Sequence, residues 1–303
     1  FFNTAEIYSE GLAEEILGKA LGAKRKDAIV ITKMHPDLHR EPDSGGFSRK
    51  HIFEACEASL KRLGTDYIDI FELHIFDTET DLEITLKALD DLVRQGKVRY
   101  IGCSNFSAWQ LMKALAISDK NKWERFVTFE AQYSLVCREL EYELVPLCLD
   151  QGVEILAFSP LHGGFLSGKY RRDQAWPDGT RFTSIHDTSR WPVDPEKLFN
   201  IVDELDRIAK EKNVTVSQVA LNYLLRKPGV CSLIIGIRTA KQLEENIKAT
   251  DWELTPEEVT RLDKISEPPH IYPYIWRLSP DEIDNLYRTG EIAQQYLKKA
   301  DEK

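Results

Sequence analysis

The sequence predicts a (β/α)8 barrel, the TIM-barrel fold, whose first βα unit is missing from this chain. Short apolar segments alternate with amphipathic segments of helical period along most of the 303 residues. The short segments are apolar at consecutive positions, which is typical of parallel strands buried on both faces. We count seven such units, one fewer than a closed barrel needs. We expect the eighth to precede Phe1, because the chain begins inside a strand.

The first half of the chain contains four predicted strands. They comprise residues 1–2, 28–34, 67–74 and 98–105. Helical spacing of apolar residues predicts helices after them, at 12–21, around 52–63, at 82–94 and at 109–117. Gly22 suits a helix C-terminal cap. The second of these helices should bury one face, formed by Ile52, Cys56, Ser59, Leu60 and Leu63.

The second half continues the alternation after one irregular stretch. Strands are predicted at 126–134, 153–160 and 229–237, and helices at 140–149, 196–211, 216–226, 241–249 and 255–265. Residues 161–195 are rich in Gly, Arg, Trp and Pro and predict a long loop. Two of the helices begin with a capping box, Thr215 with Gln218 and Thr255 with Glu258.

The composition excludes several classes of protein. The formal net charge of −10 argues against nucleic acid or an anionic membrane as the main partner. The longest apolar runs are too short for a membrane span. Five cysteines are widely spaced without a CxxC pair, which indicates reduced thiols in a cytoplasmic protein. We predict a single barrel domain over residues 1–276 and a helical tail over 277–303. An open doubly wound sheet is the alternative, but no GxGxxG follows an early strand.

Three residues with proton-transfer chemistry stand where predicted strands end. Tyr8 follows the first strand, Lys33 closes the apolar run AIVITK, and His74 closes YIDIFELH. Each has an ordinary structural reading as a packed aromatic, a surface lysine or a core histidine. Together they form a phenol, an ammonium and an imidazole at the end of a barrel where active sites lie. His35 and His39 have metal-like spacing, but no third ligand is near them in the sequence, and we predict no metal site.

Several motifs in this chain resemble the aldo-keto reductase family, in particular the branch with potassium-channel beta subunits and microbial reductases. They are FFNTAEIY, VITK, LKRLGTDYIDIFELH, VRYIGCSNF, AQYSL, AFSPLHGGFLSGKY and IIGIRTAKQLEENI. The resemblance extends to about Trp276 and implies a TIM barrel that reduces aldehydes or ketones with NADPH. It also implies that Tyr8 donates the proton, Lys33 lowers the pKa of Tyr8, and His74 orients the carbonyl oxygen.

Asn3 departs from the family pattern, which has an aspartate there that pairs with the lysine. Asn3 can still accept a hydrogen bond from Lys33, but it supplies no charge. We therefore expect Lys33 to be an unpaired ammonium that either loses its proton more easily or acidifies Tyr8 further. Either effect would reduce turnover or shift its pH profile.

The resemblance also implies a set of NADP(H)-binding residues. Ser104, Asn105 and Gln132 match residues that hold the carboxamide, and Phe158 matches the aromatic that stacks on the nicotinamide. Ser159, Leu161, Gly163, Gly164, Ser167 and Lys169 match the pyrophosphate loop. Gly236, Arg238, Thr239, Gln242, Glu245 and Asn246 match the adenosine 2′-phosphate and adenine segment.

Two other functions remain open from the sequence. Asn3 and the likeness to channel subunits are compatible with an NADP(H)-binding regulatory or redox-sensing subunit with little turnover. A barrel isomerase or lyase would use a phosphate site at the last two strands and no nicotinamide. The leading interpretation is a reductase with a small carbonyl substrate, with a homo-oligomer as a possible assembly. The substrate itself is set by loops and is not predicted.

Overall fold

The computed structural model describes residues 1–36, 45–172, 174–180, 194–269 and 271–274. The chain divides into two compact units, Phe1–Ser266 and Glu267–Lys303. The first unit contains every strand and helix described below. The tail predicted over 277–303 lies outside the described residues, and so does His39.

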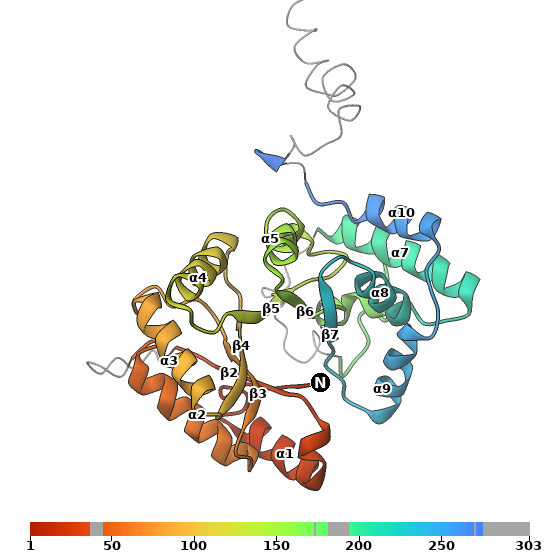
Figure 1. Ribbon diagram of the computed structural model, residues 1–303. Helices are drawn as coiled ribbons and strands as arrows, with labels where there is room; N and C mark the ends of the chain where they lie inside the picture. The colour runs from red at the N-terminus through yellow and green to blue at the C-terminus, as the bar shows by residue number, and fades with distance from the viewer. Residues whose placement is uncertain (37–44, 173, 181–193, 270, 275–303) are drawn as a thin grey trace, which may run out of the picture. The chain divides into compact units, whose positions relative to one another are not determined.

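Seven parallel strands form one sheet in chain order, which curves into a nearly closed barrel (Figure 1). They are β1 (Phe2–Asn3), β2 (Val30–Met34), β3 (Ile68–Leu73), β4 (Val98–Ser104), β5 (Phe126–Gln132), β6 (Glu154–Phe158) and β7 (Val230–Ile234). Each pairs with its neighbour in sequence. The TIM-barrel prediction and the count of seven βα units are confirmed.

The helices surround this sheet on its outer side (Figure 1). They are α1 (Leu12–Leu21), α2 (Arg49–Leu63), α3 (Leu82–Arg94), α4 (Ala108–Asn121), α5 (Leu144–Gln151), α7 (Pro195–Lys212), α8 (Val216–Leu225), α9 (Ala240–Ile247) and α10 (Pro256–Ile265). Short 3-10 turns lie at Gly22–Asp27, Glu139–Glu141, His162–Ser167 and Lys248–Thr250. Both predicted capping boxes, on α8 and α10, are confirmed.

Local sequence explains where helices begin and end. In α2 the Ser48 side chain accepts the His51 N–H, and Gly64 ends the helix at a φ of 63°, which costs a glycine little. The predicted buried face of α2 is confirmed. The single helix predicted over 140–149 is wrong, because it is a 3-10 turn followed by α5. Pro146 has no N–H to give a preceding turn, so it fits only the first turn of a new helix.

Two hydrophobic clusters stabilise the barrel. The large one lies between the sheet and the helices and includes Phe71, Ile101 and Phe129. A small one contains Ile31, Ile70 and Leu156. Side chains alternate between the two faces of a strand, so this second cluster shares its face with Lys33 and Glu72. That face is the barrel interior, and its polar part lies toward the carboxyl ends of the strands.

Strand register aligns four of these interior positions. Lys33 pairs with Glu72, Glu72 with Gly102, and Gly102 with Thr128. The interior of β2 to β5 is therefore polar at this level. All five cysteines are free thiols.

Candidate active site

The four candidate catalytic residues meet at the carboxyl ends of the first three strands. Asn3 ends β1, Lys33 lies in β2, His74 directly follows β3, and Tyr8 is in the turn before α1. Lys33 Nζ lies 5.4 Å from the centre of the Tyr8 ring, and the Tyr8 and His74 ring centres are 5.8 Å apart. Folding thus brings together a phenol, an ammonium and an imidazole that are scattered in the sequence.

Lys33 is fully buried, and its ammonium has two acceptors. Its Nζ donates to Asn3 Oδ1 at 2.5 Å and to Glu130 Oε2 at 3.2 Å. Asn3 Nδ2 donates to the same Glu130 oxygen at 2.7 Å. The prediction that Asn3 can accept a bond from Lys33 is confirmed. The expectation that Lys33 lacks a counter-charge is wrong, because Glu130 on β5 supplies one.

Glu130 is a functional candidate that sequence reasoning missed. It is 97 positions from Lys33, and it sits in the apolar run FVTFEAQ among residues that form a strand. A single acidic residue inside a buried strand is a recognisable signal, since an isolated carboxylate is costly to bury without a partner. The partner itself could not be read from the sequence.

Burial raises the pKa of Tyr8 above its ordinary value, and the negative charge of Glu130 adds to this rise. The positive charge of Lys33 and its hydrogen bond to Tyr8 oppose the rise. Lys33 therefore acts in the predicted direction, but in this structure burial outweighs it. The phenol is protonated near neutral pH, as a proton donor must be.

His74 is held as a neutral imidazole. Burial, and secondarily the charge of Lys33, lowers the pKa of His74 to about 4. Its backbone is fixed from two sides: its N–H donates to Met34 O at 2.9 Å, and its carbonyl accepts the Asn105 side chain at 3.0 Å. A neutral ring can donate one hydrogen bond to a carbonyl oxygen without adding a charge. His35 packs edge-on against His74 at 5.8 Å, so this residue belongs to the site as well.

A second carboxyl group lies beneath this cluster. Glu72 is fully buried and accepts the Thr128 hydroxyl on Oε1 at 2.8 Å. Burial raises the pKa of Glu72 well above its ordinary value, and the charge of Glu130 raises it further, which favours the protonated carboxyl. Gly102 makes room for it, since a Cβ there would lie 2.2 Å from Thr128 Oγ1 and 2.9 Å from Glu72 Oε1.

The residues expected to hold the nicotinamide carboxamide lie beside His74. Ser104 is buried at the end of β4, and its hydroxyl donates to Glu130 O at 3.0 Å. Asn105 Nδ2 donates to Ser104 Oγ at 2.9 Å as well as to His74 O. Gln132 ends β5 on the same strand face as Glu130 and pairs in register with Phe158, the last residue of β6. Hydroxyl and amide groups next to an aromatic ring suit a carboxamide and its ring.

The expected pyrophosphate loop follows β6 directly. Ser159 has a φ of 53°, Gly163 of 66° and Gly164 of 105°. The φ of Gly164 is one that side chains rarely adopt, and a Cβ there would also lie 2.9 Å from Lys169 Nζ. Ser167 Oγ donates to Gly164 O at 2.7 Å, and Leu161 O accepts the Gly164 N–H. Half-buried glycines, which have no side chain to shield their backbone, and the exposed ammonium of Lys169 suit a phosphate-bearing ligand.

The third expected segment joins β7 to α9. Gly236, Arg238, Thr239 and Gln242 are exposed, whereas Glu245 and Asn246 are half-buried. Thr239 caps α9 by accepting the Gln242 N–H, and Gln242 Oε1 accepts the Arg238 N–H at 2.8 Å. The Arg238 guanidinium donates to Gly179 O at 2.8 Å, which holds the end of the loop after β6 against this segment.

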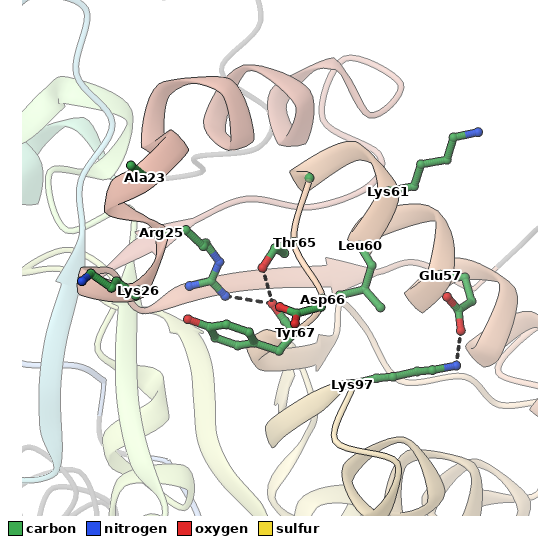
Figure 2. Close-up of a pocket in the computed structure, with 11 residues that line it drawn as sticks. Ala23, Arg25, Lys26, Glu57, Leu60, Lys61, Thr65, Asp66, Tyr67 and Lys97 are labelled. Atoms are coloured by element: carbon green, nitrogen blue, oxygen red, sulfur yellow. Dashed lines mark hydrogen bonds and ion pairs between the residues drawn. The ribbon is translucent and has the colours of Figure 1, made fainter.

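A hollow of about 900 Å³ lies at the opposite end of the barrel (Figure 2). Its walls precede β2, β3 and β4 in the chain, so it faces the amino ends of the strands. Arg25 there donates to Tyr67 O, and Lys97 pairs with Glu57. The hollow contains none of the candidate catalytic residues. Among the described residues no group of His, Cys, Asp and Glu could hold a metal ion. None of the described helices is long and apolar enough to cross a membrane.

Comparison with known proteins gives the class to which this fold and site belong. Residues 1–267 match the model of the aldo/keto reductase family. The chain is 33% identical over 293 residues to versiconal hemiacetal acetate reductase of Aspergillus parasiticus, covering 90% of this chain and 84% of that protein. It is 36% identical over 275 residues to a putative voltage-gated potassium channel subunit beta of Schizosaccharomyces pombe, covering 87% and 79%. The crystal structure of a thermostable aldo-keto reductase, Tm1743, with the inhibitor epalrestat matches with a TM-score of 0.68 and 32% identity, covering 87% of this chain and 81% of that one.

The chain belongs to the aldo/keto reductase family. Members of this family are NAD(P)H-dependent carbonyl reductases. The branch with fungal reductases and potassium-channel beta subunits is also the one that the sequence motifs predict.

Proposed function

We propose that this protein reduces an aldehyde or ketone to an alcohol with NADPH. The observation that carries the proposal is the cluster of a protonated Tyr8, a buried Lys33 and a neutral His74 at the carboxyl ends of the strands. Bound NADPH would supply the hydride to the carbonyl carbon. The protein's own groups must then deliver a proton to the carbonyl oxygen.

Each side chain has a distinct part in that proton transfer. Tyr8 donates its phenolic proton, and Lys33 stabilises the phenolate that remains, because its ammonium is close and shielded from water. His74 orients the carbonyl oxygen by donating a hydrogen bond. A neutral imidazole does this without repelling Lys33, which an imidazolium would do.

The cofactor contacts are assigned from the chemistry of the donor groups. Ser104, Asn105 and Gln132 would bind the carboxamide, and Phe158 would stack on the ring. Ser159, Leu161, Gly163, Ser167 and Lys169 would contact the pyrophosphate. Gly236, Arg238, Thr239, Gln242, Glu245 and Asn246 would hold the adenosine end. Arg238 is the basis for preferring NADPH to NADH, since a guanidinium binds a 2′-phosphate with two parallel hydrogen bonds.

The first test is a fluorescence titration with NADPH, followed by NADPH consumption with 4-nitrobenzaldehyde. Tyr8→Phe should lower kcat by about 10²- to 10⁴-fold while leaving the NADPH Kd within about twofold. Tyr100→Phe is the matched control, because this tyrosine is exposed on β4 and is not part of the site. An active Tyr8→Phe enzyme would refute the assignment of the proton donor.

Cofactor preference is tested by Arg238→Ala. We expect NADPH to bind about tenfold more weakly, a loss of about 1.4 kcal/mol, while NADH binding is unchanged. Arg207→Ala removes an exposed arginine on α7 that pairs with Glu204 and serves as the control. Equal losses for the two cofactors would contradict a 2′-phosphate contact.

A regulatory or redox-sensing subunit is the second candidate. It is favoured by the 36% identity to proteins described as potassium channel subunits beta in fission yeast and Arabidopsis thaliana. Such a subunit would bind NADPH but turn over little. The Glu130 carboxylate weakens the argument from Asn3, because Lys33 retains a counter-charge. Binding without turnover, across a range of aromatic and aliphatic aldehydes, would favour this candidate.

A further inference from the structure

The charge that balances Lys33 is not on the residue that contacts it most closely. The closest acceptor is the Asn3 amide at 2.5 Å, which is neutral, and the carboxylate is Glu130 at 3.2 Å. Asn3 contacts both groups, because its oxygen accepts from Lys33 and its Nδ2 donates to Glu130 Oε2 at 2.7 Å. A buried ammonium needs a counter-ion to remain charged. Among the described residues only Glu130 forms an ion pair with it.

Glu72 fixes the far side of this pair. Its Oε1 accepts from Thr128, whereas its Oε2 is buried and accepts no hydrogen bond from any described group. A buried carboxyl oxygen in that position is satisfied if it carries a proton and donates it. The acceptor available is Glu130. One proton on Glu72 leaves one negative charge on Glu130, which matches the single positive charge of Lys33.

We propose that Glu130 is a positioning residue of the reductase site: its carboxylate, held by the Asn3 side chain, is the counter-charge that keeps the Lys33 ammonium beside Tyr8. This inference rests on the proposed function for its catalytic meaning. It goes beyond that function because it assigns the acidic role to Glu130 in the interior of β5 and not to the residue at the end of β1, Asn3. It also explains why Asn3 can stand at its position without leaving Lys33 unpaired.

The proposal predicts a signed effect on Tyr8. The titratable groups around Glu130 are Lys33 from β2, Glu72 from β3, His74 directly after β3, and Tyr8 from the turn after β1. Glu130→Gln leaves the buried Lys33 without its counter-charge, so Lys33 releases its proton more readily and Tyr8 loses the cation that favours its ionisation. The alkaline limb of the kcat profile, where Tyr8 loses the proton it must donate, should therefore move to higher pH.

The decisive variant is the double exchange Asn3→Asp with Glu130→Gln. It moves the carboxylate to the other side of the same hydrogen bond and keeps the total charge and the number of heavy atoms. We expect Glu130→Gln alone to shift the alkaline limb by at least about half a pH unit and to lower kcat about tenfold. We expect the double exchange to return the alkaline limb to its parent position and kcat to within about threefold of the parent value.

Glu14→Gln is the matched control. Glu14 is also a fully buried carboxylate in an ion pair, with Arg62 at 2.6 Å, and it accepts the Thr32 hydroxyl. It lies outside the site, so its loss should lower the melting temperature without moving the pH profile. A shift with Glu14→Gln as large as with Glu130→Gln would show that the effect is structural and would overturn the proposal.

A second readout does not depend on turnover. The ionisation of Tyr8 can be followed by NMR of ¹³C-labelled tyrosine in the protein without cofactor, with Tyr8→Phe to assign the signal. Its midpoint should rise in Glu130→Gln, recover in the double exchange and stay in place in Glu14→Gln. If the parent chain reduces no carbonyl, the proposed function fails while this titration still decides the role of Glu130.

Two results would overturn the inference. The first is a Tyr8 midpoint and a pH profile that Glu130→Gln leaves unchanged. The second is a double exchange that keeps the shifted profile or remains unfolded, because that variant restores one carboxylate next to Lys33. If Glu130→Gln alone does not fold, a folded double exchange with the parent profile supports the proposal.

Discussion

Lys33 shows how one buried charge organises its surroundings. Burying an ammonium costs several kcal/mol unless a counter-ion and hydrogen bonds replace water. Here Glu130 provides the charge, and Asn3 provides a second acceptor and fixes the carboxylate. The Glu130 carboxylate also affects the protonation of Glu72, a second buried carboxyl group next to it. Burial raises the pKa of Glu72, and repulsion by the Glu130 carboxylate raises it further, so Glu72 holds its proton more tightly than a free carboxyl group does.

The protonation of Glu72 predicts how stability depends on pH. Its folded-state pKa is raised above the unfolded value, so the native state holds a proton that the unfolded chain releases above about pH 4.5. The free energy of unfolding should therefore fall as pH rises above this value, by up to about 1.4 kcal/mol per pH unit from this group. Glu72→Gln, whose amide can donate to Glu130 and accept from Thr128, should remove this slope and be more stable than the parent at pH 8.

Urea denaturation at intervals from pH 5 to pH 8 measures this effect. Glu154→Gln on β6 is the control, since that residue is exposed and its loss should leave the slope intact. Parallel curves for Glu72→Gln and the parent chain would mean that Glu72 is ionised in the folded protein. The arrangement of one proton and two carboxyl groups would then be wrong.

At the scale of elements, the strands differ in how much of the barrel interior their side chains occupy. Gly102 in β4 has no side chain, and its neighbours Glu72 and Thr128 from β3 and β5 fill the space. The polar cluster therefore depends on one strand contributing almost no volume. This division of space between three strands is set by register, which aligns these residues side by side.

Gly102→Ala should consequently destabilise the fold by about 1–3 kcal/mol, the usual cost of overpacking a core. The new Cβ would lie 2.2 Å from Thr128 Oγ1, so the Thr128–Glu72 hydrogen bond must break or move. Gly236→Ala is the control for stability, because a Cβ there meets nothing within 4 Å. Equal melting temperatures for the two variants would show that β3 to β5 accommodate the extra methyl group without a loss of stability.

Helix caps allow a second prediction at this scale. Thr215→Ala removes the side chain that accepts the Gln218 N–H and opens the capping box of α8. The cost should be about 1 kcal/mol. Thr260→Ala in α10 removes an exposed hydroxyl that bonds only a carbonyl four residues earlier, and it should be nearly neutral. If urea denaturation shows Thr260→Ala to be less stable than Thr215→Ala, the role of the cap is contradicted.

For the whole molecule, the sequence predicts the order of strands and helices better than the interior contacts. Apolar runs and helical spacing define each βα unit locally, and the parallel barrel follows from their repetition. The Lys33–Glu130 pair could not be predicted in this way, because it joins β2 to β5 through the barrel interior. The break before α5 was also missed, although Pro146 is the local signal that explains it.

The two ends of the sheet are a property of the molecule as a whole. Within the described residues β1 pairs only with β2, and β7 only with β6. The adjoining helices α1 and α9 expose apolar side chains, with Ile16 58% exposed and Ile247 55% exposed. Unpaired strand edges next to apolar surface favour association with another chain. In Figure 1 these two helices are the first and the last around the sheet.

This chain should therefore associate with itself more strongly as its concentration rises. Ile16→Glu with Ile247→Glu places charge beside both edges and should lower the apparent mass measured by light scattering during size-exclusion chromatography. Ile84→Glu is the matched control, because Ile84 is 51% exposed but lies on α3, away from both edges. If the control lowers the mass as much as the double variant, general surface charge is responsible. If the parent chain is monomeric at every concentration, its edges are protected in solution.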